Sequence, residues 1–241
     1  MILLLLCYSC LLVISGTQDV TCGADCSCHG YTMACLGENL PTYLPWNITE
    51  IFLQDVDFKE VAKHFQSQPQ EWSAITRLTL QSTFSKEIVS GMFTVFKVLK
   101  YLKVEGDVFS NISISAFVGL DTVETLDLSA NGNLLYDSVA KALCFVNNGI
   151  HVLSNLKMLN ISWIGRKYFE PVNMDFNFFV SLSSGRRLKQ LDISHINLAV
   201  LDIRNFYPLC DNGLETLVLE FAVFSSVGYY YIPDLSYSIT L

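Results

Sequence analysis

The chain has 241 residues, of which 51% are hydrophobic and 16% charged, and its formal net charge is -8 at pH 7. This composition excludes a disordered protein, because disordered chains are poor in apolar residues. The acidic balance argues against a broad phosphate-binding surface, which needs an excess of Lys and Arg. The length allows one or two domains, and the mean hydropathy of +0.37 raises the question of a membrane protein.

The first sixteen residues predict a secretory signal peptide. Residues 2–14 are almost all apolar and are followed by Ser15, Gly16 and Thr17. This stretch is shorter than the ~20 residues that span a bilayer, although a signal anchor is the alternative. We therefore assign residues 1–16 to a signal peptide and expect an extracellular or secreted product.

Four cysteines follow closely in the pattern C-x3-C-x-C-x6-C: Cys22, Cys26, Cys28 and Cys35. In a secreted chain this density predicts disulfides, but the sequence alone does not choose among the pairings. A zinc site with His29 as an extra ligand is the alternative, although the spacing fits no common zinc pattern.

The rest of the chain repeats the pattern L-x-x-L-x-L, with Leu, Ile or Val at places 1, 4 and 6. The pattern occurs seven times, and successive starts are 27, 24, 24, 33, 32 and 26 residues apart. Phe93 and Phe96 stand 18 and 21 residues after one start, and Phe117 and Leu120 stand at the same offsets after the next. This arrangement matches the leucine-rich repeat, whose unit is roughly 20–29 residues long.

The repeats predict an α/β solenoid, a horseshoe with short parallel strands on its concave face. Places 4 and 6 point inward because side chains alternate along a strand, and stacked units share one core. This core accounts for the high hydropathy without a membrane segment. In the best unit, VETLDLSAN, Asn131 stands where its amide can satisfy backbone groups between repeats. The other units lack this asparagine, so we expect irregular turns there.

The cysteine run and the following LGENLPTYLPWNITEIFL resemble the N-terminal cap of extracellular leucine-rich-repeat proteins. The resemblance implies that the first cysteine pairs with the third and the second with the fourth, giving Cys22–Cys28 and Cys26–Cys35. We assign residues 17–47 to this cap. Residues 48–241 then hold about seven repeats and the start of an eighth, with Ile239 and Leu241 in its places 4 and 6.

From residue 17 onward the chain resembles the N-terminal part of a Toll-like receptor ectodomain. The uneven repeat lengths, the LDLSAN unit and the phenylalanines behind the strands carry this resemblance. It implies pattern recognition in innate immunity, with a protein or microbial ligand and receptor dimerisation. We hypothesise that the chain is the recognition part of a longer receptor anchored in the plasma or endosomal membrane. The alternative is a secreted leucine-rich-repeat adhesion, matrix or decoy protein without a signalling role.

Three sequons predict N-glycosylation at Asn47, Asn111 and Asn160. The exposed positions of the strands form the default binding surface of a solenoid. Asn160 lies on that surface, so a glycan there would direct a ligand to the flank or to the loops at residues 132–150 and 164–187.

One region combines basic and aromatic residues and is a candidate binding region. It comprises Trp163, Arg166, Lys167, Tyr168, Arg186 and Arg187. Its charges are too few to favour nucleic acid as the partner.

No enzyme motif or cofactor motif stands out, and we expect neither a catalytic activity nor a cofactor. The four histidines, His29, His64, His151 and His195, are scattered, and we interpret His195 as an ordinary surface residue. Cys144 and Cys210 lie two repeats apart, roughly 10 Å, which exceeds the ~7 Å limit between Cα atoms for a disulfide unless the loops reach across. A bridge and two free thiols both remain open.

Overall fold

The computed structural model describes residues 20–23, 25–37, 39–41, 43–165, 171–199, 202–220, 223–224 and 238–240. The predicted signal peptide and the first residues of the predicted cap lie outside this part of the chain. None of the described helices is long and apolar enough to cross a membrane.

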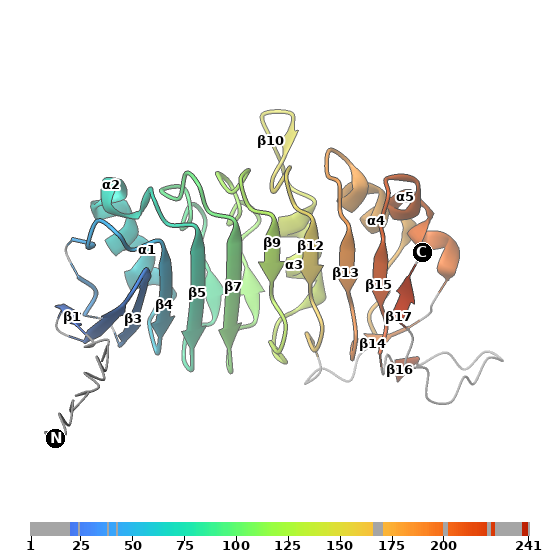
Figure 1. The fold of residues 1–241 in the computed structure, drawn as a ribbon. Helices are drawn as coiled ribbons and strands as arrows, with labels where there is room; N and C mark the ends of the chain where they lie inside the picture. The colour runs from blue at the N-terminus through green and yellow to red at the C-terminus, as the bar shows by residue number, and fades with distance from the viewer. Residues whose placement is uncertain are drawn as a thin grey trace, which may run out of the picture.

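One sheet of eleven strands runs the length of the molecule in the order β1-β2-β3-β4-β5-β7-β9-β12-β13-β15-β17 (Figure 1). The strands from β3 to β15 are parallel, and each of the seven sequence repeats supplies one strand from β4 onward. The bounds are β1 Val20–Gly23, β2 Cys26–His29, β3 Thr32–Leu36, β4 Glu50–Gln54, β5 Arg77–Ser82, β7 Tyr101–Gly106, β9 Thr125–Asp127, β12 Met158–Asn160, β13 Gln190–Asp192, β15 Thr216–Val218 and β17 Ser238–Thr240.

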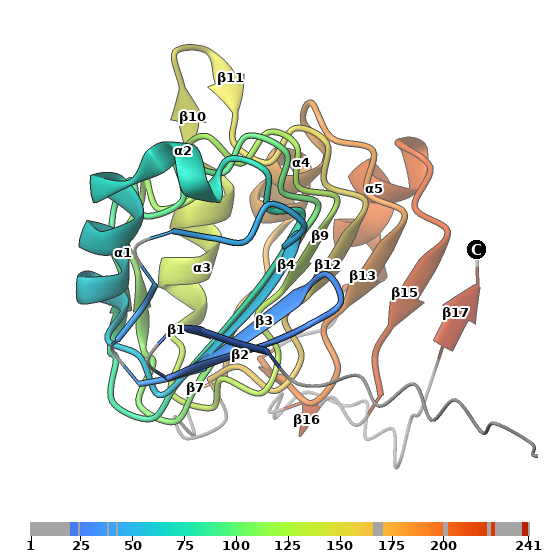
Figure 2. The same cartoon turned by 60° about the vertical axis from the view of Figure 1, so that its left-hand side comes forward.

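The connections between these strands carry short helices and two-residue strands, and α1 and α3 cover one face of the sheet (Figure 2). The helices are α1 Phe58–Ser67, α2 Pro69–Trp72, α3 Tyr136–Leu143, α4 Phe176–Ser183, the 3-10 helix η1 Ile203–Phe206 and α5 Tyr207–Asp211. The short strands are β6 Glu87–Ile88, β8 Asn111–Ile112, β10 Val146–Asn147, β11 Ile150–His151, β14 Asn197–Leu198 and β16 Val223–Phe224. Strands β10 and β11 form a hairpin that projects beyond the sheet (Figure 1).

The strands form because apolar and polar residues alternate, which suits a sheet with one buried face. In β5, Leu78 and Leu80 are fully buried, whereas Thr79 and Gln81 between and after them are partly exposed. The parallel register places Leu78 beside Leu102 of the next repeat, so place 4 forms a continuous buried column. The apolar residues thus belong to the core of the solenoid, as the repeat predicts.

Aromatic side chains fill the space between the sheet and the outer helices. Helix α1 begins after Asp57, whose carboxylate accepts a hydrogen bond from the Lys59 amide. Its buried residues recur at helical spacing, and Phe65 packs against Phe96 and Trp72, with ring centroids 4.9 and 4.8 Å away. The phenylalanines noted in the sequence therefore build the outer wall of the core.

The N-terminal cap closes one end of this core. Strand β2 pairs antiparallel with both β1 and β3, and β3 joins the parallel run beside β4. The disulfides are Cys22–Cys28 and Cys26–Cys35, the pairing that the family resemblance implies, so these sulfurs are not available to zinc. Met33 beneath them is fully buried and covers the first repeat.

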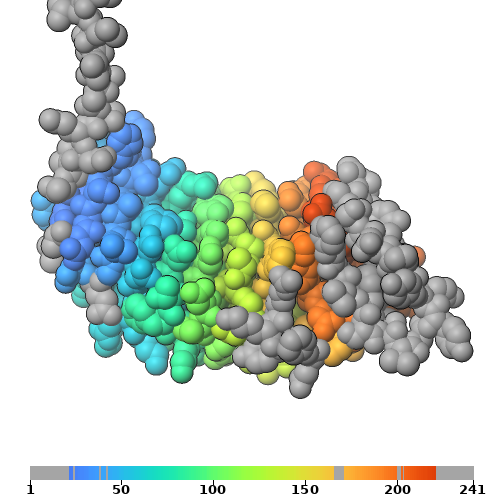
Figure 3. All heavy atoms as spheres, turned by 90° about the horizontal axis from the view of Figure 1, so that it is seen from below, coloured from blue at the N-terminus to red at the C-terminus, as the bar shows by residue number. Residues whose placement is uncertain are grey.

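The other end departs from the expected eighth repeat. A further repeat would add a parallel strand, but β17 runs antiparallel to β15, with Ile239 opposite Leu217. Antiparallel pairing covers the edge strand without the long crossover that a parallel strand requires. Leu241 lies outside the described residues. Seen from below, the molecule forms a shallow arc (Figure 3), and the sheet that faces the viewer in Figure 1 lies on its inner side.

Asn131 satisfies the backbone between repeats, as its position in the sequence predicts. Its side chain is fully buried. The Oδ1 atom accepts a hydrogen bond from the Gly106 amide at 2.8 Å, and Nδ2 donates to the carbonyls of Val104 and Leu128, both at 2.8 Å. One amide thus completes three backbone groups that water cannot reach.

Where the asparagine is missing, other side chains form the hydrogen bonds to the backbone groups between repeats. Ser85 accepts from the Phe58 amide at 2.8 Å and donates to the Val56 carbonyl at 3.2 Å. After β13, the Asp192 carboxylate accepts from the Ser194 amide at 2.9 Å, and His195 takes a left-handed conformation with φ 58°. The turns are irregular because a different side chain forms the hydrogen bonds to the backbone in each of them.

We predict that Asn131→Ala lowers the free energy of unfolding by about 2–4 kcal/mol, because three buried backbone groups lose their partner. The control is Asn155→Ala, since exposed Asn155 donates a single hydrogen bond to the Asp121 carbonyl. It should cost less than about 1 kcal/mol. Urea denaturation measures both, and equal losses would contradict the special role of Asn131.

Candidate functional site

The outward positions of the strands lie on the inner face of the arc, where the sequence predicts a binding surface. Most are partly exposed, but Ser162 and Ser194 are buried in the turns after their strands. The predicted positions are Phe52, Gln54, Thr79, Gln81, Lys103, Glu105, Asp127, Ser129, Asn160, Ser162, Asp192, Ser194, Val218 and Glu220.

A group of polar side chains occupies β5, β7 and β9, and we call it the central polar cluster: Arg77, Tyr101, Lys103, Glu105 and Asp127. The Arg77 guanidinium lies 4.1 Å from the centroid of the Tyr101 ring, and Lys103 pairs with Glu105 at 2.9 Å. Asp127 stands beside Lys103 in the parallel register. The cluster offers a cation, an aromatic face and carboxylates within three neighbouring strands.

The charges of this cluster stabilise one another. Burial alone would lower the pKa of Lys103, but the hydrogen bond and charge of Glu105, with the charge of Asp127, raise it overall. Burial, followed by the charge of Asp127, raises the pKa of the Tyr101 phenol. At neutral pH the cluster therefore presents an ammonium group and a protonated phenol as hydrogen-bond donors.

Arg77 and Tyr101 were not among the binding residues predicted from the sequence. They occupy place 3 of their repeats, directly before the inward leucine of place 4. Alternation along the strand turns place 3 outward together with places 5 and 7. This signal was present in the sequence and could have identified both residues.

Place 2 of the repeats forms a second row, which we call the charge ladder. Glu124 pairs with Lys100 at 3.1 Å and with Lys157 at 2.7 Å, and Lys189 pairs with Glu215 at 2.6 Å. Hydrogen bonds from Lys157 and then Lys100 lower the pKa of the Glu124 carboxyl. Such exposed ion pairs add little stability, but within each pair the opposite charges offset each other along the edge of the sheet.

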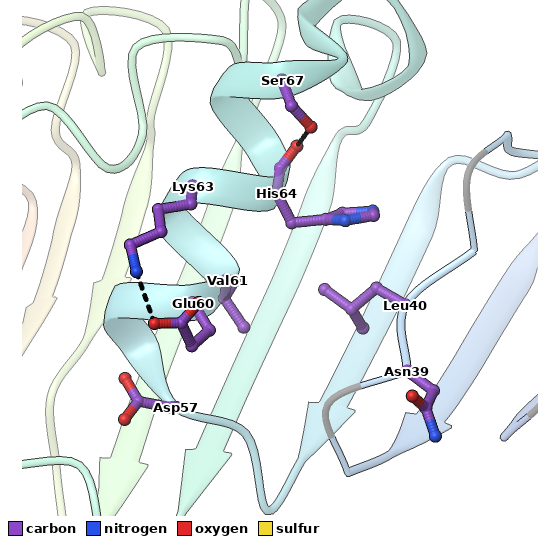
Figure 4. A pocket seen from close by; sticks show the side chains of 8 residues that line it. All are labelled: Asn39, Leu40, Asp57, Glu60, Val61, Lys63, His64 and Ser67. Atoms are coloured by element: carbon purple, nitrogen blue, oxygen red, sulfur yellow. Dashed lines mark hydrogen bonds and ion pairs between the residues drawn. The ribbon is translucent and has the colours of Figure 1, made fainter.

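Two hollows lie near the N-terminal cap. One, of about 370 Å³, opens over β2, β3 and β4 and is lined in part by Leu36 and Phe52. The other, of about 450 Å³, lies between the cap and helix α1. Figure 4 shows Leu40 and Val61 pointing toward each other across this second hollow, while Lys63 pairs with Glu60 beside it.

The structure only partly assembles the predicted basic and aromatic region. Arg166, Lys167 and Tyr168 lie outside the described residues, and Arg187 is exposed. Trp163 stacks on His195 with ring centroids 3.9 Å apart, so His195 is not the ordinary surface residue that we expected. Both residues have left-handed backbones at the same position of successive repeats, which brings their rings together.

Arg186 was predicted to be a binding residue, but its side chain is buried, with 2% exposed, and it does not belong to the surface. The guanidinium donates to the Val152 carbonyl at 2.8 Å, to the Ser181 carbonyl at 2.9 Å and to the Leu143 carbonyl. Leu143 ends α3, and Ser181 lies in the last turn of α4, where a cation stabilises unpaired carbonyls. Burial lowers the pKa of Arg186 to about 10, so it remains a cation at neutral pH.

Among the cysteines that the structure describes, Cys144 and Cys210 are free thiols. Cys144 follows α3, and burial raises the pKa of its thiol, although Ser181 and Arg186 act in the opposite direction. Cys210 lies in α5, and burial, followed by the charge of Asp211, raises its pKa. Both thiols are therefore less reactive than an unperturbed cysteine.

The three sequons occupy different surroundings. Asn47 lies in a turn before β4 and donates to the Gly30 carbonyl at 2.7 Å. Asn111 lies in β8 and donates to the Glu87 carboxylate at 3.1 Å. Asn160 lies in β12 on the inner face, and its Oδ1 accepts from the Ser162 amide at 3.0 Å.

We predict that Arg186→Met lowers the free energy of unfolding by about 3 kcal/mol, because buried carbonyls at two helix ends lose a charged donor. The neighbouring Arg187→Met is the matched control, and its cost should stay within about 0.5 kcal/mol because Arg187 is exposed. Urea denaturation measures both. A destabilisation by Arg187→Met equal to that of Arg186→Met would refute the assignment.

We also predict that the Glu124 carboxyl titrates below a normal glutamate. Because its pKa is lowered in the folded state, its contribution to stability is present above the unfolded pKa and is lost as the pH falls through the folded value. In Lys157→Met the pKa of Glu124 should rise, since the largest cause of the shift is removed. Carbon-13 NMR titration of the side-chain carboxyl measures this, and an unchanged pKa would contradict the ladder.

Comparisons with known proteins support the fold. No protein-family model matches the chain, and no curated protein matches it. The crystal structure of human 5T4 (Wnt-activated inhibitory factor 1, trophoblast glycoprotein) is similar, with a TM-score of 0.63 and 21% identity over 85% of this chain and 73% of that chain. At this identity the likeness shows the fold alone. With the parallel strands and the disulfide-bonded cap, it shows that the chain is a leucine-rich-repeat solenoid.

Proposed function

We propose that the chain is the extracellular ligand-binding segment of a leucine-rich-repeat receptor and that its ligand binds the inner face of the arc. The central polar cluster is the observation that supports this most directly. It presents both charges and an aromatic ring on three adjacent strands, on the face opposite the outer helices. Arg and Tyr are enriched among the residues that dominate binding energies in protein interfaces.

The sequon at Asn160 borders the cluster at one strand. Asn160 on β12 lies directly beside Asp127 on β9, whereas the other members of the cluster lie on β5 and β7. A glycan on Asn160 would therefore cover Asp127 and its neighbours and leave β5 and β7 accessible. A ligand would then use the N-terminal half of the face rather than the loops of the long repeats that the sequence pointed to.

The finer proposal is a Toll-like receptor that recognises a microbial ligand, dimerises and signals through parts of a longer, membrane-anchored chain. It rests on the sequence resemblance, and the β10–β11 hairpin supports it because it gives the 33-residue repeat a projecting feature suited to a second contact. A second candidate is a secreted adhesion or matrix protein. The likeness to 5T4, described as a trophoblast glycoprotein, favours retaining this candidate.

We predict that Lys103→Glu weakens ligand binding about tenfold or more, because it reverses the charge at the centre of the cluster. Lys63→Glu is the matched control. Lys63 also pairs with a glutamate, Glu60, but lies on helix α1, away from the inner face. Surface biosensing of the secreted chain would use lipopolysaccharide, bacterial lipopeptide and double-stranded RNA as microbial probes, and laminin and collagen as matrix probes.

Binding to a microbial probe that only Lys103→Glu weakens would support the receptor. Binding to laminin or collagen with the same dependence would support adhesion instead. An equal loss in both variants, or no effect of Lys103→Glu on any bound probe, would contradict the inner face as the site.

A further inference from the structure

The turn before β4 exposes an aromatic side chain that nothing in the core requires. Trp46 is 96% exposed, and Tyr43, three residues earlier, is 67% exposed. Indole rings are usually at least partly covered in folded proteins, and an exposed apolar patch commonly marks a contact. The turn is closed by a hydrogen bond from the Ile48 amide to the Pro45 carbonyl at 3.0 Å, which places Trp46 and Asn47 at its two central positions.

The position next to Trp46 is a sequon, Asn47-Ile48-Thr49. The side-chain amide of Asn47 donates one hydrogen bond, to the Gly30 carbonyl at 2.7 Å. An amide nitrogen carries two N–H bonds, so a sugar can replace one while the other keeps this contact. The Asn47 side chain is therefore anchored in a position that remains compatible with modification.

The two other sequons are less favourable. Asn160 stands in a row between Asp127 and Asp192 of the adjacent strands, which are about 4.8 Å away on either side. At Asn111 the side chains of both sequon residues bind the same carboxylate oxygen of Glu87, Asn111 at 3.1 Å and Ser113 at 2.8 Å. Only Asn47 combines a place at the tip of a turn with an uncovered aromatic neighbour.

We propose that Asn47 carries an N-linked glycan whose first sugars lie on the exposed Trp46 ring. In the transfer, Nδ2 of Asn47 bonds to C1 of the first sugar of a lipid-linked oligosaccharide donor. The bond from C1 to the diphosphate oxygen breaks, the lipid diphosphate leaves with the bonding electrons, and one amide proton passes to solvent. The C–H face of the sugar then covers the indole, while its hydroxyl groups remain in water.

The backbone around the turn restricts where the glycan can lie. The amides of Thr49 and Glu50 both donate to the Tyr31 carbonyl, at 2.9 and 3.0 Å, so the turn is held against the loop between β2 and β3. Tyr31 is itself 67% exposed. The glycan would thus shield the aromatic side chains of the cap and leave the inner face of the repeats free for the ligand.

The test compares Thr49→Ala, which destroys the sequon, with Thr49→Ser, which preserves it. Both are made in a Trp163→Phe background, so that Trp46 is the main accessible indole, because Trp72 is fully buried. The proteins are secreted from mammalian cells, and mass spectrometry of the peptide containing Asn47 reports its occupancy. Acrylamide quenching of tryptophan fluorescence reports the exposure of Trp46.

We expect Asn47 to be glycosylated in the parent and in Thr49→Ser, and quenching to be about twofold stronger in Thr49→Ala, because the ring loses its cover. Enzymatic removal of the glycan from the folded parent should give the same increase, which keeps the test valid if Thr49→Ala is poorly secreted. Asn111→Gln is the control and should leave quenching unchanged. An unmodified Asn47 in the parent, or quenching that does not depend on the glycan, would overturn the proposal.

Discussion

The structure depends on the parallel register that holds each repeat against the next. Leu78 lies beside Leu102, and Leu102 beside Leu126, so places 4 and 6 form uninterrupted apolar columns. A slip of one residue in any strand would turn its leucines toward water. Such a core excludes water from the turns between strands, and each turn must therefore satisfy its backbone groups with protein atoms. Three chemically different side chains form these hydrogen bonds to backbone groups of the preceding repeat. They are the amide of Asn131, the hydroxyl of Ser85 and the guanidinium of Arg186.

The same register creates the outer surfaces. Side chains from positions 24 or more residues apart in the sequence become neighbours because they share a place in the repeat. Arg77 lies over Tyr101 for this reason, and Glu124 meets both Lys100 and Lys157. A binding surface of this kind is built on backbone that the core already fixes, so little conformational entropy is lost when a ligand binds.

The sequence was sufficient to predict the structural features that depend on the period of the repeat. The apolar columns, the role of Asn131 and the pairing implied for the cysteines all depend on local spacing or on a familiar cap pattern. Arg186 could not be predicted, because a run of basic residues normally indicates exposed charge, and its carbonyl partners come from segments up to 43 residues away. The antiparallel β17 was missed for a similar reason. Its sequence fits a repeat strand equally well in either direction, and only the three-dimensional arrangement decides which pairing forms.

The charges of the central polar cluster lie beside charges of opposite sign, which limits how this surface can act. Lys103 pairs with Glu105 and adjoins Asp127, and in the charge ladder Glu124 pairs with lysines on both sides. Long-range attraction needs an excess of one sign over a surface, and the cluster has none because its two cations are matched by two carboxylates. Selectivity must then arise at short range, from the fit of a ligand to paired donors and acceptors and to the Tyr101 ring. A ligand that matches this pattern replaces existing ion pairs with its own contacts, whereas one that carries only charge leaves a buried or partly buried group without a partner. The register that makes the core thus also makes the inner face a surface that discriminates by geometry.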